Sequence, residues 1–305
     1  MKKLLLGLVF LAAPLLALEE EELVWEQTGP TVTDFNRYMQ EAIADEDWWA
    51  VIDYADIISY HFPTSPFAQE TAYLMGYSYL KLGQLELANQ MLSTYLTHFA
   101  NHAHFEEAIQ LKFQIADAFA NGSKKSLFGS HKMPKWLPAE EDAVTIFDEV
   151  IAAIPHSDIA AKSLLGKGKV QREIEDFKPA VETLQTLIRR FPKTEMAAEA
   201  YLQVSKTYLE QCKKTSLDLD LLSLAQVNLK KFKLAFPREP RLEEAEKIYS
   251  EVEELFANNL LETAKFYERT KKLPASKIYY NRVIAKYPES EAAKLARQRM
   301  SELPK

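Results

Sequence analysis

A recurring hydrophobic register organises most of this chain. In five of the six instances an aromatic or large aliphatic residue stands directly before a proline, and in all six a small or β-branched residue stands twelve positions before the proline position. Apolar residues at helical spacing fill the stretches between these points, which predicts amphipathic helices. The instances pair Val51 with Phe62-Pro63, Ala88 with Phe99-Ala100 (the proline is lost here), Ala143 with Ile154-Pro155, Ala180 with Phe191-Pro192, Ala225 with Phe236-Pro237, and Ser276 with Tyr287-Pro288.

The spacing of these end points predicts repeated helical hairpins. They fall at 63, 100, 155, 192, 237 and 288, so the intervals are 37, 55, 37, 45 and 51 residues. Periods of this length are typical of solenoids, and the unequal intervals predict insertions in loops or lengthened helices. Each proline should end the second helix of a pair, because proline cannot continue a helix. A hydroxyl residue two positions past a proline can then cap the next helix, at Ser65, Ser157, Thr194 and Ser290.

Small residues inside the first helices, such as Gly76 and Gly168, should let two helices approach closely, and Gly83 marks a short turn. This register resembles the tetratricopeptide repeat (TPR), best at residues 69–100 and next in the unit that ends at Pro192. The predicted fold class is therefore an all-α, tetratricopeptide-like helical-hairpin solenoid, in which each hairpin is stabilised by stacking on its neighbours. A non-repetitive helical bundle is the alternative.

The chain divides into five predicted segments. Residues 1–17 form a signal peptide and 18–30 an extended N-terminal segment; residues 31–120 form N-terminal helical repeats, and 139–303 form C-terminal helical repeats. Residues 121–138 form a long irregular loop with lysines and aromatics interleaved. A loop of this length is either functional or a tolerated insertion.

The first seventeen residues have the order of a secretory leader. Lys2 and Lys3 precede an uncharged apolar run, and Ala17 is suited to precede a cleavage site. The run is too short to span a bilayer. A bacterial lipoprotein would need a cysteine where Ala17 and Leu18 stand. We therefore expect export with a cleaved signal peptide and an indirect association with the membrane.

Charge and composition exclude several functions. The chain carries −7 overall, but residues 201–305 hold 20 Lys and Arg against 15 Asp and Glu. The acidic front half argues against nucleic-acid binding, which needs clustered basic residues. The basic back half is either a solvated surface or a docking surface for an acidic partner. Only eight glycines and one cysteine, Cys212, occur, which argues against Gly-rich phosphate loops and disulfide frameworks.

No catalytic set emerges, so we expect no enzyme activity, no cofactor and no metal. His98, His102 and His104 have a spacing that could hold a metal, but they are better interpreted as ordinary polar residues of a turn between two helices. Cys212 precedes two lysines that could lower its pKa, yet no base is identifiable, and a packed thiol is the better interpretation. Trp48-Trp49 is interpreted as core packing of the first repeat, with an aromatic rim for a peptide as the alternative.

Two segments resemble the BamD-like (YfiO) assembly proteins of the Gram-negative outer membrane. Residues 50–99 contain the helix that ends in Phe62-Pro63, the Ser65-Pro66-Phe67 step and a tyrosine-rich helix. Residues 264–296 contain the order of the family's last repeat, with Asn281-Arg282-Val283 before Tyr287-Pro288. The family's lipid-bearing cysteine is missing here. The alternative is a CpoB-like (YbgF) periplasmic adaptor that coordinates envelope processes, although no coiled coil precedes the repeats.

The resemblance implies a periplasmic scaffold at the inner face of the outer membrane that acts by binding alone. Its N-terminal repeats would receive the aromatic C-terminal signals of unfolded outer-membrane proteins. Its C-terminal repeats would bind a BamA-like barrel-inserting subunit, with Arg282 contacting an acidic group. The candidate pocket residues are aromatic, and some of them must instead belong to the core: Tyr54, Tyr60, Phe67, Tyr73, Tyr77 and Tyr79.

Overall fold

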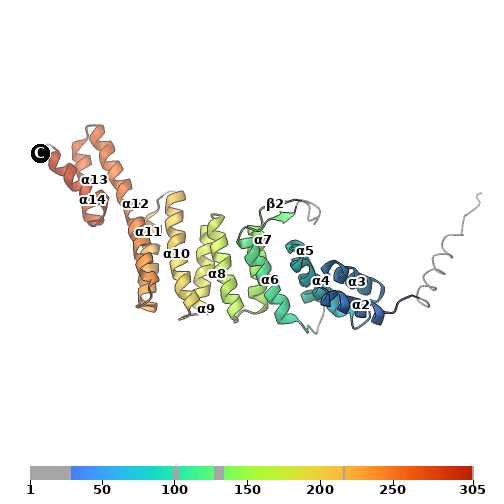
Figure 1. Ribbon diagram of the computed structural model, residues 1–305. Coiled ribbons are helices and arrows are strands. Elements are labelled where there is room, and N and C mark those ends of the chain that lie inside the picture. The colour runs from blue at the N-terminus through green and yellow to red at the C-terminus, as the bar shows by residue number, and fades with distance from the viewer. Residues whose placement is uncertain (1–28, 99–102, 127–133, 216, 304–305) are drawn as a thin grey trace, which may run out of the picture. The chain divides into compact units, whose positions relative to one another are not determined.

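The computed structural model describes residues 29–98, 103–126, 134–215 and 217–303. The predicted leader, nearly all of the extended segment and the middle of the predicted loop lie outside these residues. Within the described ranges the chain forms thirteen helices and one two-stranded sheet (Figure 1). They are α2 (Val32–Ala44), α3 (Trp48–His61), α4 (Ala68–Lys81), α5 (Leu85–His98), α6 (Phe105–Ala120), β1 (Lys125–Ser126), β2 (Lys135–Leu137), α7 (Glu140–Ala153), α8 (Asp158–Glu173), α9 (Phe177–Arg190), α10 (Glu195–Lys214), α11 (Leu219–Ala235), α12 (Arg241–Arg269), α13 (Leu273–Lys286) and α14 (Glu291–Glu302).

Consecutive helices pack as hairpins, which confirms the predicted TPR-like fold. The two helices of a hairpin contact each other in the pairs α2–α3, α4–α5, α8–α9, α10–α11 and α12–α13. Successive hairpins also contact each other, because the second helix of one packs against the first helix of the next, as in α3–α4, α7–α8, α9–α10 and α11–α12. The first helices α8, α10, α12 and α14 contact one another in sequence. The outer face of α14 is mostly polar, as a terminal capping helix requires.

The described helices belong to two compact units. Within the described residues, the first unit ends at Leu111 and the second begins at Lys112. The boundary therefore falls inside α6, whereas the sequence suggested the segment 121–138. That segment also differs from the expected irregular loop, since β1 and β2 pair antiparallel within it, with Lys125 opposite Leu137.

The prolines end the second helices as predicted. The residue before each proline is the C-cap, and its ψ lies between 49° and 66°, outside the helical region, at Phe62, Ile154, Phe191, Phe236 and Tyr287. The predicted hydroxyl caps form at Ser157, Thr194 and Ser290, where each side chain accepts the backbone N–H three residues on. Ser65 is an exception: its hydroxyl accepts from the Phe67 N–H, and α4 begins only at Ala68.

The turns inside the hairpins share one backbone geometry. The second residue after each of four first helices has a positive φ of 56° to 68°, at Glu46, Gly83, Glu175 and Lys271. In each turn, two successive N–H groups bond back to carbonyls of the helix in the Schellman pattern. The sequence signalled this turn only at Gly83. The other three positions carry residues that rarely adopt this conformation.

Small residues occupy the close contacts of the core. All six residues of the twelve-before-proline register are buried: Val51, Ala88, Ala143, Ala180, Ala225 and Ser276. A Cβ built on Gly76 would come within 2.8 Å of Leu92, and one on Gly168 within 2.6 Å of Leu184. Both contacts are sixteen residues apart, so the same packing recurs in two repeats. The long intervals of the register appear as the lengthened helices α10 and α12 and as the segment between α6 and α7.

Candidate protein-binding surfaces

Two of the predicted pocket aromatics support the core of the first unit. Tyr54 lies on α3, with its ring centroid 5.8 Å from that of Tyr38 and 6.4 Å from that of Phe35. Phe67, at the start of α4, packs against the same buried cluster of α2 and α3. Both side chains are only partly buried, but much of their apolar surface is used inside the repeat.

Tyr73 and Tyr77 lie one turn apart on α4. The Tyr73 ring stacks on His104 with centroids 4.4 Å apart, and it also contacts Tyr95, whose hydroxyl oxygen accepts the His104 N–H. Burial, and next the charge of Glu107, raises the pKa of Tyr73. The Tyr73 ring therefore has its position fixed by its neighbours.

Tyr77 belongs to an aromatic and cationic group. Its ring meets the edge of Trp48, and the ammonium of Lys81 lies 5.2 Å from the Tyr77 centroid and 6.0 Å from that of Trp48. Trp48 packs against the core cluster, as its core interpretation predicted. The ring of Trp48, one face of Tyr77 and the lysine form a surface suited to stacking.

Tyr60, Trp49 and Tyr79 are placed differently from Tyr73 and Tyr77. Tyr60 is 79% exposed at the end of α3, and Trp49 is 43% exposed at its start, so the core interpretation is wrong for Trp49. Trp49 contacts Tyr79 of α4 edge-on at 6.5 Å. Burial raises the pKa of Tyr79, and the nearby carboxylates Asp56 and Asp53 add to the effect. Of the predicted pocket aromatics, only Tyr60 is exposed, and the other five are partly buried, a difference that their sequence spacing did not predict.

Arg282 lies on the exposed face of α13. Its guanidinium carbon is 5.1 Å from the centroid of Tyr279, and Tyr279 stacks on Tyr267 of α12 with centroids 5.3 Å apart. No carboxylate in the described part of the chain lies within ion-pair distance of it. The aromatic stack supports the guanidinium plane, and its N–H groups remain available. Phe266 and Ile278, each next to one of these tyrosines in the chain, are also about half exposed.

A polar triad joins the last three helices. Arg299 of α14 donates to both oxygens of Glu268 at the end of α12, and the Tyr280 hydroxyl of α13 donates to the same carboxylate at 2.7 Å. The bond from Arg299 lowers the pKa of Glu268, and Tyr280 contributes as well. Burial and the Glu268 contact raise the pKa of Tyr280 to about 12. The triad holds the capping helix against the hairpin that carries Arg282.

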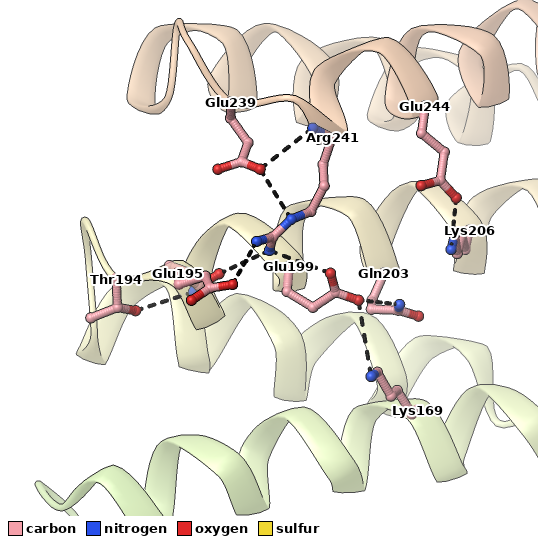
Figure 2. A network of polar contacts seen from close by, with 10 residues as sticks. Lys169, Thr194, Glu195, Glu199, Gln203, Lys206, Glu239, Arg241 and Glu244 are labelled. Atoms are coloured by element: carbon pink, nitrogen blue, oxygen red, sulfur yellow. Dashed lines mark hydrogen bonds and ion pairs between the residues drawn. The ribbon is translucent and has the colours of Figure 1, made fainter.

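The sequence did not reveal a network of ion pairs across the first helices of the second unit. Figure 2 shows Arg241, at the start of α12, reaching Glu195 at 2.9 Å and Glu199 at 3.4 Å on α10, and Glu239 at 3.0 Å. Glu199 also accepts from Gln203, at 2.6 Å.

The network continues on both sides of α10. Gln203 accepts from Arg172 of α8, while Lys206 pairs with Glu244 of α12 at 2.8 Å. Lys169 of α8 lies 3.9 Å from the Glu199 carboxylate (Figure 2). Side chains of opposite charge therefore bridge α8, α10 and α12, and they fix the register of these helices along one face.

The structure describes Cys212 and only part of the histidine group that the sequence offered for catalysis or metal binding. The Cys212 thiol is buried in α10, and burial raises its pKa, as the interpretation of a packed thiol predicted. Lys213 and Lys214 pair instead with Glu251 and Glu175. The His98 side chain and His102 lie outside the description, and the described residues contain no cluster of three metal-ligating side chains. Over the same ranges, no helix combines the length and hydrophobicity that crossing a bilayer would take.

The family follows from a match over nearly the whole described chain. The model of a family described as "YfiO: Outer membrane lipoprotein" matches residues 30–206 and, in a second alignment, residues 139–304. The chain belongs to the YfiO family. The overlap at 139–206 is expected for YfiO-type repeats, since similar hairpins can be aligned in two registers. Membership implies an assembly role at the outer membrane, exercised through protein–protein contacts by a non-catalytic scaffold.

Solved structures with TPR folds resemble this YfiO-family chain weakly. YrrB, described as a TPR protein with an unusual peptide-binding site, is 11% identical with a TM-score of 0.40, over 74% of this chain and 97% of that one. The apo form of RapI is 14% identical with a TM-score of 0.41, over 94% and 81%. A thermophilic TPR protein of Thermus thermophilus is 15% identical with a TM-score of 0.33, over 73% and 98%. No curated protein sequence matches significantly.

Proposed function

We propose that the protein is a periplasmic scaffold for the assembly of outer-membrane β-barrel proteins, that it acts at the inner face of the outer membrane, and that it works by binding alone. The observation that supports this proposal is the match to the YfiO family over residues 30–304. The cleaved leader and recruitment to the membrane through a partner, both inferred from residues 1–18, are part of the same proposal.

The substrate in this proposal is the aromatic-rich C-terminal signal of an unfolded outer-membrane protein. Such a segment is extended, so it needs rings to stack on and hydrogen-bonding groups beside them. Tyr60, Tyr73 and Tyr77 meet the first need: Tyr60 is exposed, and the other two sit in fixed aromatic groups on α4. Tyr54 and Phe67 would act mainly by supporting this surface from the core.

The partner in this proposal is a BamA-like barrel-inserting subunit, bound by the C-terminal repeats. Arg282 supports it because the side chain is exposed, stacked on Tyr279 and without an ion-pair partner in the described residues. A guanidinium held in this way is well placed to bind a carboxylate of a partner with two parallel hydrogen bonds. The Glu268 triad keeps this hairpin and its capping helix together.

Co-purification tests the proposal. The mature chain carrying an affinity tag should retain the barrel-inserting subunit in mild detergent. Failure to retain it would exclude the proposed role in barrel assembly and favour the alternative, a CpoB-like adaptor. Arg282→Glu should reduce the retained subunit several-fold, while the matched charge reversal Lys286→Glu, one turn further on α13, should not. Equal retention by the two variants would exclude Arg282 as the contact.

A further inference from the structure

A groove lies between the second helices α9 and α11, with α10 as its floor. Its volume is about 260 Å³. Ile188 of α9 forms one wall, and Leu224 and Val227 of α11 form the other, while Tyr201 and Tyr208 of α10 line the floor. This α9–α11 groove shares no lining residue with the ion-pair network or with the Arg282 surface.

The α11 wall exposes more apolar surface than a solvated helix normally would. Leu224 is 47% exposed and Val227 45%, and Leu234, further along the same helix, is 84% exposed. The spacings of three and seven residues place all three on one stripe of α11, about 15 Å long at 1.5 Å per residue. Contiguous apolar surface of this kind commonly marks an interaction site.

The charges at the rim are basic on both sides. Arg189 lines the groove from α9 and Lys231 from α11, and both are exposed. No carboxylate is among the described lining residues, and none pairs with either cation in the described part of the chain. Lys233, by contrast, is neutralised by Glu246 at 2.7 Å. The groove therefore presents apolar walls between two unneutralised positive charges.

The shape of the groove is set by buried contacts. The side-chain amide of Asn228 donates to the Tyr201 carbonyl and to the Ser205 hydroxyl, both at 2.9 Å, and the residue is buried. These bonds fix α11 on α10. A partner would thus meet a preformed surface, which lowers the ordering cost of binding.

We propose that the α9–α11 groove binds an acidic amphipathic helix of a partner protein. Apolar side chains at helical spacing would lie between Ile188 and the Leu224–Val227 wall, and flanking carboxylates would pair with Arg189 and Lys231. Binding of a helix in a groove needs both features, a ridge of apolar anchors and a complementary rim. The site is additional to the two surfaces of the proposed function and does not depend on them.

The test uses the full mature chain and a fluorescein-labelled peptide of about 18 residues, built from the heptad Leu-Glu-Glu-Leu-Ala-Glu-Glu. Anisotropy titrations are run at about 0.15 M salt, where the Debye length of about 8 Å limits the effect of charges outside the contact. A peptide with lysine in place of every glutamate is the control probe. Lys231→Glu should weaken binding of the acidic peptide about fivefold or more, as loss of a rim ion pair plus new repulsion implies. Lys230→Glu, the neighbouring exposed residue outside the lining, should change it less than about twofold.

A second pair of variants tests the apolar wall. Leu224→Ser with Val227→Ser should weaken binding about tenfold or more, since two anchors are lost, whereas Leu295→Ser, a half-exposed leucine on α14, should have no effect. Circular dichroism and a thermal melt should show native folding for every variant, because all these side chains are exposed. Equal affinity for the acidic and basic peptides, or equal effects of the two lysine variants, would overturn the proposal. The proposal would also be overturned if the acidic peptide did not bind and the groove served another occupant instead. That result would be binding of phosphatidylglycerol vesicles, or self-association of the chain, that is lost when Lys231 or Leu224 is substituted.

Discussion

Gly168 is a position where alanine should destabilise the protein although it favours helix formation. In an exposed helix interior, glycine to alanine gains about 1 kcal/mol. At Gly168 of α8, however, the new Cβ would lie 2.6 Å from Cγ and 2.7 Å from Cδ2 of Leu184 on α9. Leu184 is fully buried. Two carbons are normally at least about 3.5 Å apart, so one of them must move by nearly 1 Å.

The size of the effect follows from which atom is in the way. Rotation about χ2 of Leu184 could withdraw Cδ2, but Cγ is placed by χ1 and the α9 backbone, so the helices themselves must separate. Overpacking of this kind costs about 1–3 kcal/mol. Because the backbone must move, the cost should lie in the upper part of that range, about 2–3 kcal/mol, and with the helix gain of about 1 kcal/mol subtracted Gly168→Ala should lose about 1–2 kcal/mol. Leu184→Ala alone should cost about 2–5 kcal/mol.

The assay is denaturant unfolding combined with hydrogen exchange of the α8 and α9 segments, because a repeat array need not unfold in one step. In the double variant the alanine at 168 fills part of the cavity left at 184. The combined loss should therefore be smaller than the sum of the single losses by at least about 1 kcal/mol. A Gly168→Ala variant as stable as the wild type, or additive losses, would refute this account of the packing.

Three further outcomes are expected. Gly83→Ala should lose about 1 kcal/mol by denaturant unfolding, because φ is +68° while a Cβ there would meet nothing within 4 Å; an unchanged stability would contradict a conformational cause. Ser276→Ala should raise the free energy of unfolding by about 1 kcal/mol, seen as a higher Tm, since the hydroxyl is buried without a hydrogen-bond partner among the described residues. A lower Tm would contradict this and would indicate that the hydroxyl has a partner. The lowered pKa of Glu268 means that its bonds to Arg299 and Tyr280 stabilise the fold above the unfolded pKa of about 4.5 and are lost as the pH falls further. Glu268→Gln should therefore flatten the acid limb of a Tm–pH profile, and an unchanged limb would exclude the triad as its cause.

The sequence predicted the second helices and their ends well, because proline acts locally on the backbone. It also predicted the buried small residues, since their register repeats with the helices. It could not predict the left-handed turns at Glu46, Glu175 and Lys271, where the Schellman bonds and the packing of two helices impose a conformation that these residues do not favour. Nor could it place the boundary between the units inside α6, a helix that is continuous in pattern.

The candidate sites were less predictable for a different reason. Whether a tyrosine supports the core or faces solvent depends on the direction of its ring, and Tyr54 and Tyr60 differ in this although both lie on α3. The contacts of the network that join different helices link residues 30 to 46 positions apart, such as Lys169 with Glu199 and Arg241 with Glu195. Such pairs require the particular offset between helices, which insertions change from one repeat to the next.

Helix α10 is the element through which the two faces of the second unit depend on each other. Glu199 and Gln203 of α10 bind side chains of α8 and α12 in the ion-pair network. Tyr201 and Tyr208, on the same helix, form the floor of the α9–α11 groove. Different side chains of one rigid, mostly buried helix therefore serve both faces. A substitution that shifts α10 along its axis should disturb the ion pairs and the groove together, whereas Lys231→Glu should affect the groove alone. The contrast separates an effect on the scaffold from an effect on recognition.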